Sequence, residues 1–159
     1  MVAEPDTYAT YLGAQGWAHD DWSEKFYPAD LPADWLLAFY NTRFRVVLLP
    51  GQIWIQASDA HIRQWTDDTQ DGFRFLLEVG ADPHAAAQCA AKFSGRALLL
   101  TETWIDQHVL WLPNQPDMRA LAGQITSRLK GDSPLFLISR ESCLESLEQT
   151  AELLQVMGL

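Results

Sequence analysis

Residues 11–44 read YLGAQGWAHDDWSEKFYPADLPADWLLAFYNTRF, and this stretch decides which fold the sequence predicts. Its first residues complete a short apolar segment, 8–13, that is typical of a β-strand ending in glycine. Residues 14–28 are rich in aromatic and turn-forming side chains and therefore predict a long loop. Residues 31–44 carry helix-start signals followed by an apolar stripe, which predicts a helix packed on a sheet. The order strand, loop, helix indicates the first unit of an α/β protein.

The same alternation continues to the end of the chain. Strands are predicted at 45–49, 73–79, 97–100, 108–112 and 135–138, and helices at 58–69, 83–93, 116–129 and 141–157. The link TETWIDQ, residues 101–107, is shorter than the roughly dozen residues that a parallel crossover needs. The strands on either side of it are therefore expected to form an antiparallel hairpin, or one of them lies outside the barrel.

Composition excludes several classes of partner. The chain has 11 Lys and Arg against 21 Asp and Glu, and its formal net charge of −10 argues against a nucleic acid or an anionic membrane as partner. Hydrophobic residues make up 48%, enough for the core of a single domain over 1–159. Apolar runs stay far below the roughly 18 residues of a membrane span. Without a secretory pattern or a disulfide framework, a cytoplasmic location is expected.

Glycines and aromatic residues recur at fixed spacing through the first half of the chain. They are Gly13, Gly16, Trp17, Trp22, Phe26, Tyr27, Pro28, Trp35, Leu36, Tyr40, Phe44, Trp65, Phe73 and Phe75. In this pattern the chain resembles the YecE-like family, the domain of unknown function seventy-two, over residues 8–79. Residues 134–158 resemble the family's last strand and helix more weakly. The resemblance implies a barrel of the TIM kind, with parallel strands, helices outside and no determined activity.

The chain departs from the family pattern at the ends of its strands. The family usually has a glutamate at the position of Leu48, a lysine at that of Glu78 and paired asparagines at those of Ser139 and Arg140. Chemistry in TIM barrels is lodged at the C-terminal strand ends, so these departures fall where an active site would lie. The chain is therefore expected to be a non-catalytic relative.

Length is a second departure. A complete eightfold barrel takes about 250 residues and seldom fewer than about 200, whereas this chain has 159 and six predicted strands. Since both ends of the chain resemble the family, we infer an internal deletion around residues 94–107. The expected fold is an incomplete, TIM-barrel-like α/β fold of about six mostly parallel strands. Its open edges need a cover, so a homodimer is expected.

A candidate ligand site combines aromatic and polar residues expected at the barrel mouth. Its residues are Trp17, His19, Asp20, Gln52, Trp54 and Trp104. Aromatic walls with a few polar groups suit a sugar, a nucleobase or another small planar molecule. Three further tryptophans, Trp22, Trp35 and Trp65, are expected in the core.

Two carboxylates, Glu78 and Glu102, end neighbouring predicted strands and are candidates for a catalytic acid and base. A solvated carboxylate, or a partner for Arg74, is the favoured interpretation of these positions. No histidine or cysteine has metal-ligand spacing, and Cys89 and Cys143 have the apolar neighbours of inert core thiols. We therefore expect neither a metal nor a cofactor.

Three functions follow from these observations. The favoured one is a non-catalytic binding or interaction protein that keeps an aromatic pocket. The alternative is a small-ligand hydrolase or isomerase that uses Glu78 and Glu102, with His19 or Asp20 positioning the substrate. A third is a subunit that docks on a full-length family member through its apolar interior.

Overall fold

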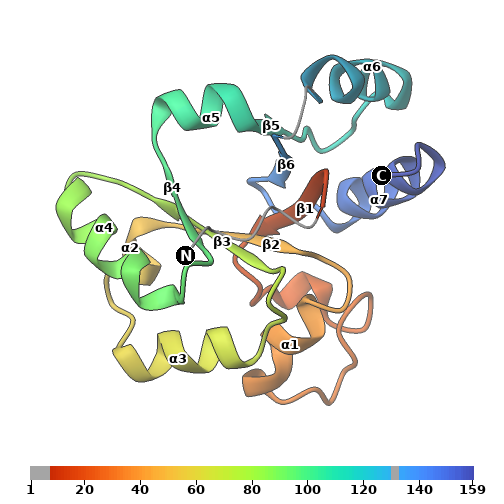
Figure 1. Cartoon of the computed structure of the whole chain (residues 1–159). Helices are drawn as coiled ribbons and strands as arrows, with labels where there is room; N and C mark the ends of the chain where they lie inside the picture. Colours follow the sequence, from red (N-terminus) through yellow and green to blue (C-terminus); the bar gives the residue numbers. More distant parts are fainter. Residues whose placement is uncertain (1–7, 130–132) are drawn as a thin grey trace.

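The computed structural model describes residues 8–129 and 133–159, and within them six parallel strands form one curled sheet (Figure 1). The strand order is β4-β3-β2-β1-β6-β5, and every neighbouring pair is parallel. The strands are β1 (Thr10–Gln15), β2 (Val46–Leu49), β3 (Arg74–Glu78), β4 (Ala97–Leu100), β5 (Val109–Trp111) and β6 (Leu135–Ser139). The prediction of an incomplete, TIM-barrel-like α/β fold is confirmed.

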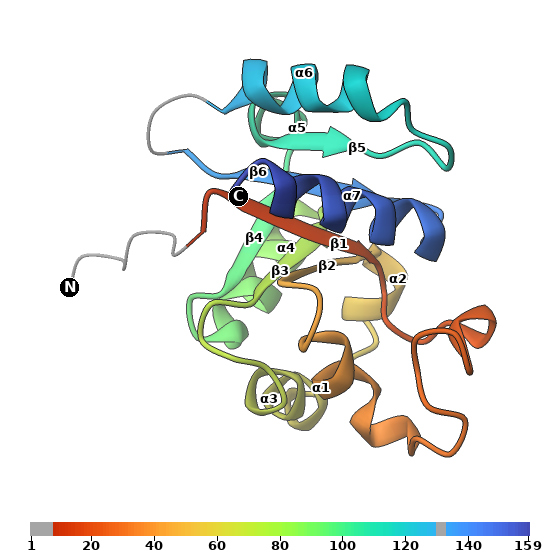
Figure 2. The same ribbon diagram turned by 90° about the vertical axis from the view of Figure 1, so that its right-hand side faces the viewer.

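Helices follow the strands as the sequence pattern predicts. The α-helices are α1 (Leu36–Tyr40), α2 (Gly51–Trp54), α3 (Asp59–Asp67), α4 (Pro83–Ala90), α5 (Glu102–His108), α6 (Met118–Arg128) and α7 (Leu144–Val156), with 3₁₀ turns η1 (Asp20–Trp22), η2 (Ala33–Trp35) and η3 (Ala91–Phe93). Helix α7 lies along β1, and α6 lies beside β5 (Figure 2). The short helix α2 was not predicted from the sequence.

The two faces of the sheet bury separate cores. The outer face packs under the helices, with α1, α3, α4, α6 and α7 supplying side chains such as Tyr40, Ile62 and Leu147. The inner face buries alternate strand residues such as Val46 and Phe136. Helix α5 contributes Trp104 and Ile105 to this inner core. A full barrel would fill this space with strand side chains alone, so α5 closes part of the inner face that the incomplete barrel leaves open.

The prediction of an antiparallel hairpin around residues 101–107 is wrong. Those residues form most of α5, whose N-cap Thr101 accepts a hydrogen bond from the backbone N–H of Trp104 at 3.2 Å. Strand β4 pairs only with β3, and β5 pairs only with β6, among the strands described. The short link suffices because it does not return to a neighbouring strand position; it spans the gap between the two edges of the sheet.

The three tryptophans expected in the core have different environments. Trp22 is fully buried, which confirms its assignment. Trp65 is half-buried. Trp35 is 63% exposed, so its assignment to the core is wrong. The helix predicted over 31–44 is reduced to η2 and α1, and Trp35 lies at the junction between these two elements.

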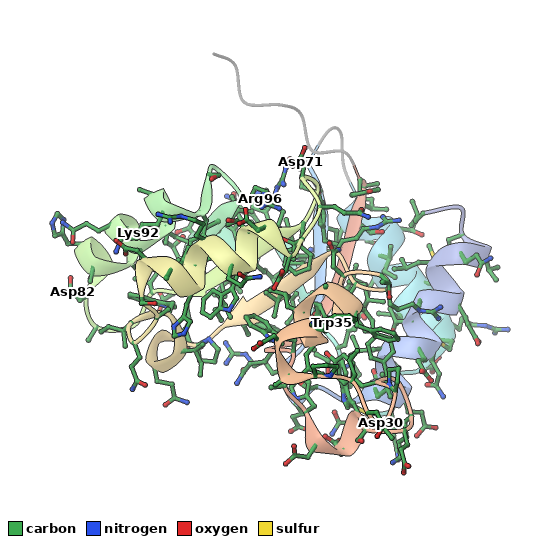
Figure 3. The ribbon with its side chains drawn as sticks, turned by 90° about the horizontal axis from the view of Figure 1, so that it is seen from below. Asp30, Trp35, Asp71, Asp82, Lys92 and Arg96 are labelled. Atoms are coloured by element: carbon green, nitrogen blue, oxygen red, sulfur yellow. The ribbon has the colours of Figure 1, made fainter. Side chains whose placement is uncertain are left out.

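Arg96 ties two neighbouring βα units together after η3. Its guanidinium donates to the backbone carbonyls of Thr66, Thr69 and Gln70, which lie in the last turn of α3 and just beyond it. It also donates to the hydroxyl of Thr69 at 3.1 Å. Figure 3 shows Arg96 beside the end of α3. A cation there also complements the partial negative charge of a helix C-terminus.

Replacing Arg96 with alanine is therefore expected to lower the free energy of unfolding by about 2 kcal/mol, because several carbonyls lose a charged donor. Urea denaturation followed by circular dichroism measures the loss. Arg96→Lys keeps the charge but not the planar fork, so it is expected to recover only part of the stability. A lysine variant as stable as the native chain would contradict the role of the fork.

Candidate functional site

The C-terminal ends of the strands lie at one end of the sheet, because all the strands run in parallel. The loop after β1 and the helix α2 after β2 meet at this end. Together they enclose a shallow hollow of about 310 Å³, which we call the β1–β2 hollow. Its lining residues are Gln15, Gly16, Trp17, Ala18, His19, Leu49, Pro50, Gln52 and Ile53. Trp17, His19 and Gln52 of the candidate ligand site are thus brought together.

Local hydrogen bonds hold the loop that carries Trp17 and His19. The hydroxyl of Tyr27 donates to the backbone carbonyl of Trp17 at 2.6 Å. Burial raises the pKa of Tyr27, so this hydroxyl stays protonated at neutral pH. The Nε2 of His19 lies 3.0 Å from the carbonyl of Gly16, a residue with a φ of 72°. The left-handed backbone at Gly16 turns the chain into the loop.

The other three candidate ligand residues lie elsewhere. Trp54 is only 4% exposed, and its Nε1 donates to the backbone carbonyl of Glu78 at 2.8 Å. Trp104 packs on the inner face, with its ring 5.1 Å from that of Phe136. Asp20 is exposed in η1 and does not line the hollow. Trp54 and Trp104 therefore serve as packing residues in the two cores.

Glu78 has a partner that sequence reasoning did not find. Its carboxylate lies 3.7 Å from a guanidinium nitrogen of Arg140, and the two side chains are 40% and 51% exposed. The guanidinium carbon of Arg140 also lies 4.3 Å from the centre of the Trp111 ring. Arg74, the partner expected from the sequence, lies at the opposite end of β3.

Glu102, the second catalytic candidate, is exposed in the first turn of α5. Leu100 of β4 pairs with Glu78 of β3, and Glu102 comes two residues after Leu100. The strand ends thus bring the two carboxylates to the same side of the sheet. One is engaged by Arg140 and the other faces solvent.

The two cysteines have different environments. Cys89 is buried, and burial raises the pKa of its thiol, as expected for an inert core thiol. Cys143 is only half-buried and lies at the N-cap of α7, so its assignment to the core is wrong. Among the described residues, no group of three or more His, Cys, Asp or Glu side chains is arranged to hold a metal ion. No helix within residues 8–129 and 133–159 is long and apolar enough to cross a bilayer.

The curled sheet of parallel strands with helices on its outer face defines an open, TIM-barrel-like α/β protein. A family model described as "Protein of unknown function DUF72" matches residues 11–82. This is the YecE-like family, so the expected resemblance is confirmed over residues 11–82. The match spans β1 to the loop after β3. The family description assigns no reaction.

A solved structure of a DUF72 family protein from Thermotoga maritima is similar to the chain. Its sequence identity is 19% and the TM-score is 0.45, over 96% of this chain. The chain spans 63% of the length of that protein. A search of curated proteins gives no match.

Proposed function

We propose that the chain is a non-catalytic binding protein that takes a small planar ligand in the β1–β2 hollow. The observation that carries the proposal is the convergence of Trp17, His19 and Gln52, from two different βα connections, on one hollow. Binding sites of α/β proteins commonly lie outside the carboxyl ends of the strands. The hollow is therefore in the place where this fold class binds small molecules.

The chemistry of the hollow favours a neutral ring with polar edges. The indole of Trp17 offers an apolar surface for stacking. The exposed amide of Gln52 supplies both a donor and an acceptor, and the imidazole of His19 adds one more polar group. Nucleobases and sugars present this combination of a flat or apolar face and hydrogen-bonding edges.

A non-catalytic role is supported by the environment of the two carboxylates at the C-terminal ends of the strands. Glu78 lies in an ion pair with Arg140, which occupies its carboxylate. Glu102 is exposed at the start of α5. The inner face of the sheet is apolar near these strand ends, where Leu48, Leu100 and Ile138 are buried. A hydrolase or isomerase that uses the two carboxylates therefore receives less support than a binding protein.

Ligand-observed NMR with a panel of nucleosides and monosaccharides tests the proposal. Gln52→Ala is expected to weaken binding of a responding ligand by about fivefold to tenfold, as the loss of hydrogen bonds of this kind predicts. Gln56→Ala is the matched control, because Gln56 is exposed nearby but does not line the hollow. No response across the panel, or equal losses in the two variants, would overturn the proposal.

The open edge of β4 supports a homodimer as the second part of the proposal. Ala97, Leu98 and Leu99 are only half-buried there, and edge strands of this kind readily pair with another chain. Phe75 donates its N–H to the carbonyl of Arg96 at 3.0 Å, so the N–H of Ala97 is directed away from β3.

Light scattering at micromolar concentration is expected to give twice the 18.0 kDa chain mass. Ala97→Pro removes an edge N–H and is expected to yield a folded monomer, since proline is tolerated on edge strands. Circular dichroism checks that this variant is folded. A native chain that is a monomer at these concentrations removes the homodimer from the proposal.

A further inference from the structure

A second hollow lies on the outer side of the molecule, between the η2–α1 segment and α3. Its volume is about 580 Å³, larger than that of the β1–β2 hollow. Three tryptophans from three separate elements line it: Trp17 from the loop after β1, Trp35 from η2 and Trp65 from α3. We call it the tryptophan groove.

The indoles of the groove present accessible faces and edges. The rings of Trp17 and Trp65 meet edge to face, with centroids 5.2 Å apart and an angle of 79° between their planes. Trp35 is 63% exposed and lies on the segment facing α3 (Figure 3). A large indole left in water at the mouth of a hollow is available to stack on a ligand.

The charge of the groove has one sign. Asp34 and Asp68 line it, and no Lys or Arg is among the described residues that do so. The side-chain amide of Gln64 donates to the carboxylate of Asp68 at 2.7 Å, which fixes one of the two acids. The groove therefore combines aromatic faces with negative charge, within a chain whose formal net charge is −10.

We propose that the tryptophan groove binds an organic cation with an apolar body, such as a quaternary or alkylated ammonium group. Cations are attracted to the faces of indole rings, and Trp is the strongest aromatic partner. The carboxylates of Asp34 and Asp68 add Coulombic attraction and repel anionic ligands. A neutral sugar could stack on the indole rings, but it would gain no Coulombic attraction from the two carboxylates. This site lies outside the β1–β2 hollow and shares only Trp17 with it.

Isothermal titration calorimetry with choline, and with its uncharged isostere 3,3-dimethylbutan-1-ol, tests the proposal on the full chain. The two probes have the same shape and differ in charge. We expect choline to bind and the isostere to bind at least about tenfold more weakly, a ratio that combines cation–π and carboxylate contributions. Binding of choline is also expected to weaken as salt rises from about 0.05 M to 0.5 M, because exposed charges are screened.

Substitutions in the groove provide the second test. Trp35→Ala and the double variant Asp34→Asn with Asp68→Asn are each expected to weaken choline binding by about fivefold or more. Asp30→Asn is the matched control, since Asp30 is an exposed acid of the same connection that does not line the groove. Gln52→Ala is expected to leave choline binding unchanged, so failure here is distinguishable from failure of the proposed function.

Three results would overturn the proposal. One is equal binding of choline and its isostere, and another is unchanged choline binding in Trp35→Ala. The third is a native chain that shows no heat with choline at millimolar concentration. A change of the sedimentation coefficient in Trp35→Ala would then assign the groove to an interface between two copies of the chain.

Discussion

Replacing Gly13 with alanine is expected to lower the free energy of unfolding by about 4 kcal/mol or more. Gly13 lies in the central strand β1, paired with Val46 on one side and Ile138 on the other. A Cβ atom at this position would lie 1.9 Å from the backbone oxygen of Val46 and 2.7 Å from the hydroxyl of Tyr40. Backbone on both strands would have to move apart to make room.

The surroundings of Gly13 leave little freedom for that movement. The hydroxyl of Tyr40 donates to the same Val46 oxygen at 2.6 Å and accepts from the N–H of Ala14 at 2.8 Å. Burial raises the pKa of Tyr40, so the hydroxyl remains a donor. Separation of β1 from β2 would break both bonds inside the core, where unpaired polar groups are costly.

Gly123→Ala is the matched control for this prediction. Gly123 is exposed in the middle of α6, and an added Cβ would meet nothing within 4 Å. Alanine there is expected to raise the free energy of unfolding by about 1 kcal/mol, because glycine is a poor helix former. Urea denaturation of both variants measures the contrast. A soluble Gly13→Ala chain with native stability would show that the close approach of β1 and β2 is dispensable.

The order of elements was predictable because period and composition are local properties. The buried strand at 45–49 and the strand at 73–79 are continuous apolar or alternating runs, and both form strands of the sheet. The length of TETWIDQ does not predict the helix α5, because a short link favours a hairpin between paired strands. Thr101 and Glu102 carry a helix-start signal, but this local signal does not say with which strands β4 and β5 pair. Pairing partners are non-local, so the sequence did not reveal that β4 and β5 are opposite edges.

The candidate site was predictable where a residue lies in a loop at a strand end. Trp17 and His19 lie in the loop after β1, Gln52 lies in α2 directly after β2, and the three line one hollow. Trp54 was misplaced because its indole N–H finds an acceptor in the carbonyl of Glu78, which allows the ring to be buried. The ion pair between Glu78 and Arg140 could not be predicted from the sequence, for another reason. The two residues are far apart in the chain, and only the curl of the sheet brings them together.

The position of α5 bears on the proposed non-catalytic role. Trp104 and Ile105 of α5 join the inner core, with the Trp104 ring 5.0 Å from that of His108. Side chains of a helix therefore occupy space that barrel strands would otherwise enclose. Filling the interior stabilises an open sheet, since it removes apolar surface from water. The same filling leaves the outer connections as the places where a ligand has room, which is where both hollows lie.

Trp22→Ala is expected to lower the free energy of unfolding by about 4 kcal/mol, the second large effect in this protein. Trp22 is fully buried, and its ring lies 6.2 Å from that of Tyr40 in a stacked arrangement. Its Nε1 donates at 3.0 Å to the carbonyl of Ser142, 120 residues further along the chain. The substitution therefore leaves a large cavity and disconnects the first loop from the loop after β6.

Two further variants separate the contributions of the ring and the N–H. Trp22→Phe keeps most of the buried ring but leaves the Ser142 carbonyl without this donor, so a smaller loss of about 1–2 kcal/mol is expected. Trp35→Ala removes an exposed indole and is expected to change stability by no more than about 0.5 kcal/mol. Urea denaturation gives all three values. Equal losses for Trp22→Ala and Trp35→Ala would mean that Trp22 does not anchor the first loop.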